Sequence, residues 1–516
     1  MNPVRLPCKC IGALPLSVKM DGYKVRANPT GCQIRGYAKL FDLKLAAYFP
    51  IEDQFYWNNC ACNEYDALRR RHLLGEIPGF VRGNPFLSKL ETTLVSMSEK
   101  FPQFGPVDHK TLIENTRSTI RKRYKTAYFN LRNRVVNISG KECVSKTFVK
   151  YEKIPIGKYE AGKPPRLIQF RDFTYVYSLK KQVLGHSLAM KSGADIEWMY
   201  GQQANTVFTK LYDSFGIARI LFQSWSYFTE PVAICLDHSK FDGHYHTALL
   251  QLEHDYWLRL NPSRELKILL QQQLVNRGRT MNGHTYKVNG TRLSGEFTTS
   301  EGNSVMNYAM LVTWLKESGI KSARVHVNGD DSVVIMENKE VGKLLPYSFF
   351  NNFNMETEED RVVMDFRLIS YCQAQPIRVV KDGDLVWYMV KEPLRTMARI
   401  QYSDDRYLSI WQRYLSGVGL CELATNSGVP IMQALSLVLI SQSLKPLGSV
   451  DKVPALHSGN LSEVRHISDV TRVDYEVAFG ITPSLQKEIE AAFTGAVRSV
   501  PDLNAILLKY KLFIKN

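Results

Sequence analysis

The sequence predicts an α+β fold, and three observations carry this prediction. Pro231 to Leu236 is an apolar run of strand length that ends at Asp237. Ala323 to Val327 and Ser332 to Met336 are two β-rich arms on either side of a tight turn, which is typical of a hairpin. His244 to Leu260 has the apolar spacing of an amphipathic helix. Strands and helices are therefore expected in the same part of the chain.

Length and composition indicate one large body with a polyanionic partner. The chain has 516 residues, of which 44% are hydrophobic, and this suffices for large cores. It contains no internal repeat and no low-complexity linker, so we expect one integrated structure rather than separate domains on a string. The formal net charge of +16 fits a protein that surrounds nucleic acid, although charge alone also fits unspecific binding to acidic surfaces.

Cysteine usage and hydropathy bear on the compartment. The nine cysteines are odd in number and scattered, which favours a reducing compartment over a disulfide framework. Cys8-Lys-Cys10 and Cys60-Ala-Cys62 imitate a zinc site, but their spacing is not the usual one, and buried or free thiols are favoured. Met1 to Met20 lacks the apolar core of a signal peptide, and Ile431 to Leu444 is too short to span a bilayer.

Two chain segments carry carboxylates at positions where they can meet. Asp237 begins the segment Asp237-His-Ser-Lys-Phe-Asp242, and Asp330 with Asp331 lies at the tip of the hairpin in Asn328-Gly-Asp-Asp331. Joining nucleotides uses two metal ions, and Mg²⁺ prefers oxygen ligands from one or two carboxylates together with substrate phosphates. The Gly-Asp-Asp sequence alone would fit an ordinary turn equally well. Combined with the upstream Asp pair, it predicts a catalytic metal site of Asp237, Asp330 and Asp331, with Mn²⁺ as a substitute for Mg²⁺.

A third segment lies between these two and is predicted to form a loop followed by a helix. Ser294-Gly295 is expected to be flexible. Thr298 and Glu301 form a capping-box pattern that opens a helix, which we expect to run to about Ser318.

The start of that helix is predicted to recognise the sugar of a nucleotide. Thr299 and Asn303 are four residues apart and therefore share one helix face. Asn303 is either an ordinary buried polar residue or, together with Asp242, a hydrogen-bonding partner for a ribose 2′-hydroxyl. A site of the second kind rejects deoxynucleotides, because its own polar atoms would be left unpaired.

A basic stretch that precedes these segments is predicted to bind phosphate. Lys150, Lys153, Arg166 and Arg171 lie in a stretch broken by prolines and a glycine. Lysine and arginine on a stiffened loop suit a triphosphate, and a guanidinium can grip phosphate oxygens in two places. A solvated surface loop is the alternative for this stretch taken alone.

With these residues the chain resembles the RNA-dependent RNA polymerases of tombusviruses and tombus-like positive-strand RNA viruses. The resemblance covers residues 145 to 375 and rests on Val149-Lys-Tyr-Glu-Lys153, Pro165-Arg-Leu-Ile-Gln169, Asp237 with Asp242, Ser294-Gly295 with Thr299 and Asn303, Gly329-Asp-Asp331 and Tyr371-Cys-Gln373. Gln169 and Cys372 point to this branch in particular.

The sequence departs from the family pattern at two places. Glu296 stands where the family usually has Asp. Many such polymerases carry a lysine, proposed as the proton donor to pyrophosphate, before the Cys-Gln segment. Here Asn351 to Asp365 offers only Arg361 as a cation.

The resemblance implies a right-hand polymerase fold of fingers, palm and thumb, with an antiparallel palm sheet that has helices on one face and a mostly helical thumb. It implies fingers at residues 1–230, with a loop at 148–171 through which nucleotides reach the site and a palm contribution at about 165–190. Residues 231–260 and 291–390 would be palm, 261–290 fingers and 391–516 thumb. Cys372 and Gln373 would lie in a hairpin between palm and thumb that helps to seat the priming strand.

We therefore expect template-directed synthesis of viral RNA from ribonucleoside triphosphates, by two-metal-ion nucleotidyl transfer, in the replication of a positive-strand RNA genome. The implied partners are the RNA template, the nascent RNA, nucleoside triphosphates, and other viral replicase and host factors. Membrane contact is expected only through a partner or a missing N-terminal segment, at membrane-associated replication sites in the host cytoplasm.

Two other functions remain open at this point. A reverse transcriptase would share the carboxylates but typically carries a bulky aromatic residue where Asp242 stands. A non-catalytic basic RNA-binding subunit of a replication complex would need none of the carboxylates.

Overall fold

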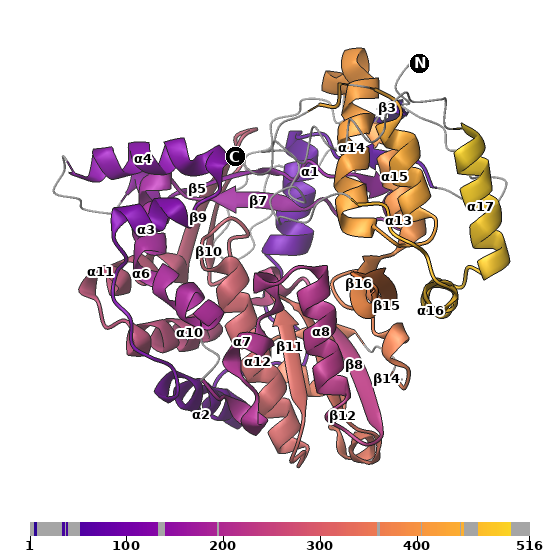
Figure 1. The fold of residues 1–516 in the computed structure, drawn as a ribbon. Coiled ribbons are helices and arrows are strands. Elements are labelled where there is room, and N and C mark those ends of the chain that lie inside the picture. The colour runs from indigo at the N-terminus through magenta and orange to yellow at the C-terminus, as the bar shows by residue number, and fades with distance from the viewer. Residues whose placement is uncertain are drawn as a thin grey trace.

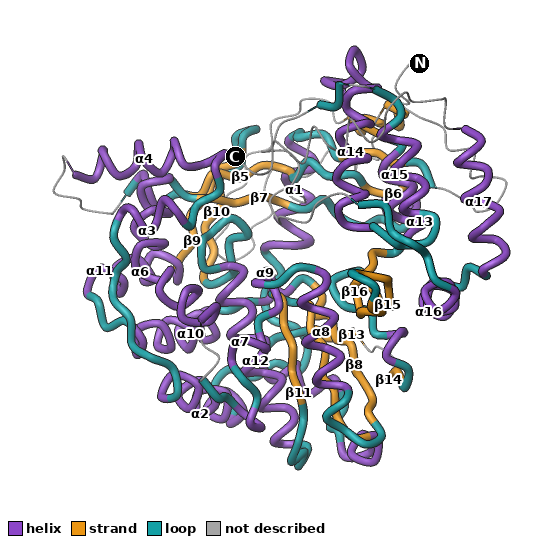
Figure 2. Tube along the Cα trace, in the orientation of Figure 1, coloured by secondary structure: helices purple, strands orange, loops and turns teal. Residues whose placement is uncertain are grey.

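The computed structural model describes residues 5–7, 33–36, 38–39, 52–132, 140–192, 196–358, 362–403, 405–443, 445–447 and 463–496. Within these ranges the protein mixes helices with mostly antiparallel sheets, which confirms the α+β expectation. Figure 2 shows the strands gathered into separate sheets between the helices. Two of these sheets, together with helices packed against the first, carry the candidate site.

The first sheet has the strand order β11-β12-β8-β13, and β14 also pairs with β8. All its pairs are antiparallel, and its strands are β8 (Pro231–Ser239), β11 (Arg324–Asn328), β12 (Asp331–Glu337), β13 (Glu356–Glu358) and β14 (Val362–Val363). The pairing of β11 with β12 confirms the expected hairpin. Strand β8 does not end at Asp237 as expected but continues to Ser239, because β13 pairs with its last three residues.

Helices cover both faces of this sheet, which corrects the expectation of helices on one face. On one face Val232, Ile234 and Val334 share a core with α10 (Thr247–Leu260) and α12 (Thr299–Glu317). On the other face Ala233 and Val333 share a core with α8 (Ser214–Trp225) and with the hairpin of β15 (Ala374–Lys381) and β16 (Asp384–Lys391). Successive strand residues point to opposite faces, so an apolar run without alternation lets both faces be buried.

The predicted helices form, with differences at their starts. Helix α12 occupies the expected range and ends before Gly319, which has φ +72. The predicted capping box is wrong: Thr298 makes no side-chain capping bond, and the Glu301 carboxylate instead accepts hydrogen bonds from Ser187 and from His186, each at 2.5 Å. Helix α10 begins at Thr247, because the short α9 (Phe241–His244) occupies the preceding residues.

The second sheet has the order β10-β9-β5-β7. Its strands are β5 (Ser145–Val149), β7 (Leu167–Phe170), β9 (Val275–Thr280) and β10 (Thr285–Asn289). The central pair β5–β9 is parallel, and the other pairs are antiparallel. The inner face of this sheet buries Val149, Leu167 and Tyr286 against Ala67 and Leu68, at the end of α1 (Ala61–Ala67).

Helices follow the β15–β16 hairpin and form the C-terminal part of the molecule, drawn in orange to yellow in Figure 1. They are α13 (Pro393–Ile400), α14 (Trp411–Asn426), α15 (Met432–Ile440), α16 (Asp469–Phe479) and α17 (Pro483–Ala496). Leu415, Leu435, Tyr475 and Ile489 belong to the core that they share with β15 and β16.

The remaining elements lie mainly in the first half of the chain. The helices are α2 (Pro85–Glu99), α3 (His109–Glu114), α4 (Ser118–Arg132), α5 (Ile156–Glu160), α6 (Phe173–Ser192), α7 (Ala204–Val207) and α11 (Arg264–Leu274). The strands β1 (Arg5–Pro7), β2 (Gln33–Gly36), β4 (Gln54–Tyr56) and β6 (Ile154–Pro155) form one sheet, and β3 (Ala38–Lys39) pairs with β17 (Tyr402–Ser403). Within the described ranges, no helix combines the length and apolarity needed to cross a membrane.

Candidate active site

Carboxylates from two segments meet at one end of the first sheet. Strands β8 and β12 pair at Ser332↔Leu236, so the next position along the same ladder brings Asp331 opposite Asp237. Asp330 precedes Asp331 in the turn, where Gly329 has φ +70, a conformation that glycine adopts without strain. Asp237 and Asp330 are exposed, and Asp331 is half-buried. The expected meeting of the two segments is therefore confirmed.

The three carboxyl groups lie in one another's electrostatic field. Asp237 is exposed as a residue, yet partial burial of its carboxyl raises its pKa to about 6, and the charges of Asp330 and Glu358 add to this increase. Burial, followed by the charges of Asp330 and Asp237, also raises the pKa of Asp331 to about 6. The charge of Lys163 opposes the increase at Asp237.

This donor set fits a divalent cation that prefers oxygen, because a positive charge would relieve the repulsion among the carboxylates. Among the described residues, no three or more His, Cys, Asp or Glu side chains converge to hold a metal ion by themselves, without ligands from a substrate. Mg²⁺ is commonly held by only one or two carboxylates, with substrate phosphates and water completing its shell. The residues are therefore suited to an ion that arrives with a nucleotide.

Helix α12 holds the Gly-Asp-Asp turn through two side chains that sequence reasoning missed. Asn307 is buried, and its Nδ2 donates hydrogen bonds to the carbonyl oxygens of Gly329 and Asp330, both at 3.0 Å. The Ser304 hydroxyl accepts a hydrogen bond from the Gly329 N–H at 2.8 Å. The four-residue spacing of Asn303 and Asn307 on one helix was the available sequence signal.

His238 links the helix that holds this turn to the neighbouring strand β13. It follows Asp237 directly and is buried, and its Nε2 lies 3.2 Å from the Asn307 Oδ1. Its Nδ1 lies 2.8 Å from the Thr357 hydroxyl on β13. Burial lowers the pKa of His238 to about 4, so the ring is neutral near pH 7. The neutral ring therefore contributes hydrogen bonds to Asn307 and Thr357 rather than a positive charge.

Asp242 and Asn303 lie together beside the carboxylates, as the sequence predicted. The Asn303 Nδ2 donates a hydrogen bond to the Asp242 Oδ1 at 2.8 Å. Asn303 is only 5% exposed, and its Oδ1 has no hydrogen-bond partner among the described residues. Burial raises the pKa of Asp242 to about 6, against the opposing effects of Asn303 and Arg292. A buried acceptor is thus left open next to a carboxylate.

The loop before α12 is tied to the second sheet. The Ser294 hydroxyl donates to the Leu167 carbonyl at 3.0 Å, and the Gly295 N–H donates to the Gln169 carbonyl at 2.7 Å. A Cβ at Gly295 would lie 2.4 Å from that oxygen, so a side chain does not fit there. The pair expected to be flexible is therefore anchored. The Thr299 hydroxyl is also engaged, because it donates to the Leu293 carbonyl at 2.7 Å.

The basic stretch approaches the carboxylates at some positions only. Lys150 and Arg166 both contact Glu152, at 3.0 and 3.5 Å, and Arg166 is exposed. The charge of Arg166 lowers the pKa of Asp242, as that of Lys163 lowers the pKa of Asp237. The Lys153 ammonium instead donates to main-chain carbonyls of the C-terminal helical part, including that of Arg399 at 2.8 Å.

Arg171 corrects the sequence-based assignment to the triphosphate. It is 1% exposed, and its Nε donates to the equally buried Glu296 at 2.5 Å. Its other nitrogens donate to the carbonyls of Cys143 and Gln272 and to Asn276. A guanidinium whose donors are used inside the protein cannot grip a phosphate. This contact also gives a role to Glu296, whose carboxylate pairs with the buried arginine.

Cys372 and Gln373 form a tight turn beside the carboxylates. Tyr371 and Ala374 exchange main-chain hydrogen bonds at 2.9 and 3.0 Å, and the two central residues have φ values of 53 and 61. The Asn328 Nδ2 donates to the Cys372 sulfur at 3.2 Å, which joins this turn to the β11–β12 hairpin. Burial and then the charge of Asp331 raise the pKa of the Cys372 thiol to about 12. Gln373 is exposed.

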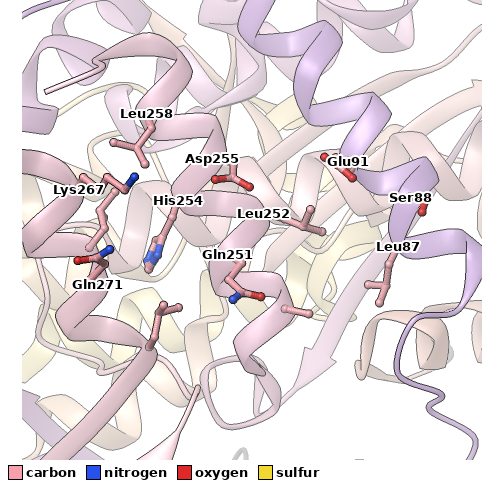
Figure 3. Close-up of a pocket in the computed structure, with 13 residues that line it drawn as sticks. Leu87, Ser88, Glu91, Gln251, Leu252, His254, Asp255, Leu258, Lys267 and Gln271 are labelled. Carbon is pink, nitrogen blue, oxygen red and sulfur yellow. The ribbon is translucent and has the colours of Figure 1, made fainter. Parts of the chain in front are cut away.

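Other candidate features lie apart from this site. A hollow of about 430 Å³ lies between α2, α10 and α11, and no predicted site residue lines it (Figure 3). Cys60 is a buried free thiol. Cys8, Cys10 and Arg361 lie outside the described residues.

Comparisons with known proteins agree with this arrangement of residues. Residues 56–499 match the family described as viral RNA dependent RNA polymerase. The chain is similar to an RNA-directed RNA polymerase of Tobacco necrosis virus (strain A), with 32% identity over 370 residues that cover 68% of this chain and 49% of the relative. A protein of the same description from Melon necrotic spot virus is 31% identical, over 69% of this chain and 46% of the relative. The chain thus spans about half the length of these curated relatives.

Proposed function

The chain belongs to the family of viral RNA-dependent RNA polymerases, and from this premise we propose that it synthesises RNA on an RNA template in the replication of a positive-strand RNA virus. Its substrates would be ribonucleoside triphosphates. The observation that carries the proposal is the meeting of Asp237 with Asp330 and Asp331 beside the hydrogen-bonded pair of Asp242 and Asn303.

In this proposal Asp237, Asp330 and Asp331 hold divalent metal ions, Mg²⁺ or in its place Mn²⁺. Burial raises the pKa of Asp237 and Asp331, and the negative charge of Asp330 raises both further, which supports this assignment. Two bound ions would make the primer 3′-hydroxyl more acidic and neutralise the departing pyrophosphate. The protein's own contribution is to hold the carboxylates at fixed positions, through the β8–β12 ladder and the Asn307 amide.

The other side chains would orient the nucleotide. The unpartnered Asn303 Oδ1 and the Asp242 carboxylate would accept a hydrogen bond from a ribose 2′-hydroxyl. Arg166 and Lys150 would bind the triphosphate, together with Lys163, whose charge acts on Asp237. Ser294, Gly295 and Thr299 would act through the backbone, by setting the start of α12. Cys372 and Gln373 would contact the priming strand.

The larger architecture is proposed on the same basis. Residues 1–230 and 261–290 would form fingers, residues 231–260 and 291–390 the palm, and residues 391–516 the thumb. The antiparallel first sheet and the helical part after Lys391 support this division. Template RNA, nascent RNA, further replicase subunits and host factors would be partners. The place of action would be membrane-associated replication sites in the host cytoplasm, reached through a partner or a further N-terminal segment.

Primer extension on an RNA template tests the proposal. The wild type should incorporate ribonucleotides. Asp330→Asn should lower the rate of incorporation by orders of magnitude, because it removes one anionic metal ligand. Asp384→Asn, in the exposed turn of the β15–β16 hairpin, is the matched control and should remain active. Synthesis by Asp330→Asn at a tenth of the wild-type rate or more would remove Asp330 from the metal site, and a wild type that incorporates no nucleotide would favour a non-catalytic RNA-binding subunit. A wild-type preference for deoxynucleotides would favour a reverse transcriptase.

A further inference from the structure

The outward face of the second sheet carries four exposed cations. They are Lys146 on β5, Arg277 and Arg279 on β9, and Lys287 on β10. Side chains alternate along a strand, and the residues between these cations are largely buried, so all four project from the same face. Figure 1 shows this sheet on the opposite side of the view from the C-terminal helices. We refer to these four residues as the basic sheet face.

The strand register brings like charges directly opposite one another. Lys287 pairs with Arg277 across β10 and β9, and Lys146 pairs with Arg279 across β5 and β9. Like charges in such positions destabilise a sheet. In the described part of the chain none of the four forms an ion pair. The arrangement is therefore suited to an anionic partner that spans several cations.

Two aromatic rings complete this face. Phe170 lies opposite Lys146, and Phe148 lies opposite Ile168, all on the outward side of β5 and β7. The two rings meet edge to face at 6.1 Å, and both are half-buried. A flat surface that combines cations with aromatic rings suits single-stranded nucleic acid, which offers both phosphates and stacking bases. An acidic protein surface would use the cations but would have less use for the rings.

The basic sheet face is connected to the candidate active site by the edge strand β7. The Ser294 hydroxyl and the Gly295 N–H both bond to main-chain oxygens of β7, at Leu167 and Gln169. Arg166, whose positive charge favours the ionised form of Asp242, immediately precedes this strand. A nucleic-acid strand that crosses the sheet toward β7 would therefore be directed to the carboxylates.

We propose that the basic sheet face binds the single-stranded RNA template before it reaches the carboxylates. The inference rests on the proposed function only in taking RNA as the substrate. Lys146, Arg277, Arg279 and Lys287 contact phosphates, and Phe148 with Phe170 contacts bases. The contacts are made to backbone and base faces, so this surface binds without regard to sequence.

The test is the salt dependence of binding to a fluorescent oligouridylate. The variant Arg277→Gln/Arg279→Gln/Lys287→Gln removes three phosphate contacts, and each contact to a single strand contributes roughly 0.7 to the slope of log affinity against log salt. We expect the slope to become less steep by about 2 and the affinity at 0.1 M salt to fall by roughly 100-fold. The control Lys321→Gln/Lys339→Gln/Lys487→Gln makes the same change in net charge at exposed lysines elsewhere and should keep the wild-type slope.

A second measurement separates this inference from the proposed function. Nucleotide addition to a short self-priming RNA hairpin, which has no long single-stranded template, should be unchanged in the variant. An unchanged slope, or an equal loss in the control, would overturn the inference even if the protein polymerises RNA. A loss of binding to phosphatidylserine vesicles with intact binding of oligouridylate would also overturn it, and would assign the face to a membrane. An inactive wild type with the expected slope change would refute the polymerase and leave the RNA surface standing.

Discussion

Replacing Asn307 with leucine should loosen the Gly-Asp-Asp turn without emptying the space that the side chain fills. The amide makes two hydrogen bonds of 3.0 Å to the carbonyls of Gly329 and Asp330. Each such bond contributes a net 0.5–1.5 kcal/mol or so, and a buried carbonyl left without a donor costs about 1–3 kcal/mol. Losing the donor to both carbonyls would then cost roughly 2–6 kcal/mol, part of which the turn can relieve by moving away from α12.

The same movement would displace the Asp330 and Asp331 carboxylates from Asp237. If about 1.4–2.8 kcal/mol of the loss appears in the transition state, kcat falls by about 10- to 100-fold. The KM for nucleotide should change little, because the bond between Asp242 and Asn303 is not touched. The concentration of Mg²⁺ needed for half-maximal rate should rise.

The assay is steady-state primer extension, with Thr313→Val as the matched control. Thr313 is also buried on α12, and its hydroxyl donates to the Ala309 carbonyl at 2.7 Å, far along the helix from the turn. Both substitutions should lower the free energy of unfolding, but only Asn307→Leu should lower kcat. Equal kcat values in the two variants at a temperature where both are folded would refute the reasoning.

Three further predictions follow from other parts of the site. Asn303→Ala should lower the GTP-over-dGTP efficiency ratio opposite cytidine by roughly 10- to 100-fold, through loss of one buried hydrogen bond worth about 1–3 kcal/mol, and an unchanged ratio would remove Asn303 from the sugar site. In denaturant titrations, Arg171→Met should lower the free energy of unfolding by about 3–5 kcal/mol, because Glu296 is left buried and unpaired. The double variant Arg171→Met/Glu296→Leu should recover most of the lost free energy. A raised nucleotide KM in Arg171→Met with full stability would contradict this structural role. The pKa values of Asp237 and Asp331 are raised to about 6, so both carboxyls hold protons below that pH, whereas above it they are charged and repel one another. Mg²⁺ should therefore raise the Tm, measured by scanning calorimetry, more above pH 6 than below it. Equal increases in Tm above and below pH 6 would contradict the repulsion between the two carboxylates.

The sequence alone located the segments that carry the candidate site residues, because each segment is short and has a recognisable local pattern. The apolar run before Asp237, the hairpin around Gly329 and the helix after Thr298 follow from local periodicity and turn preference, and each forms in the structure. The proximity of Asp242 to Asn303 was inferred from the order of the segments and is confirmed by their hydrogen bond. The end of β8 and the start of α10 were predicted less well. Pairing with β13 extends β8, and the short α9 delays the start of α10.

Only the tertiary structure decided which polar groups face the site and which are used inside the protein. Arg171 and Arg166 look alike in sequence, yet one is buried against Glu296 while the other is exposed near Asp242. Asn307 and His238 hold the turn through partners that are distant in sequence. A side chain's hydrogen-bond partners depend on which distant segments pack against it, and burial then decides whether a charge or amide serves the fold or a ligand. Local pattern therefore fixed where the carboxylates stand, and packing fixed what holds them there.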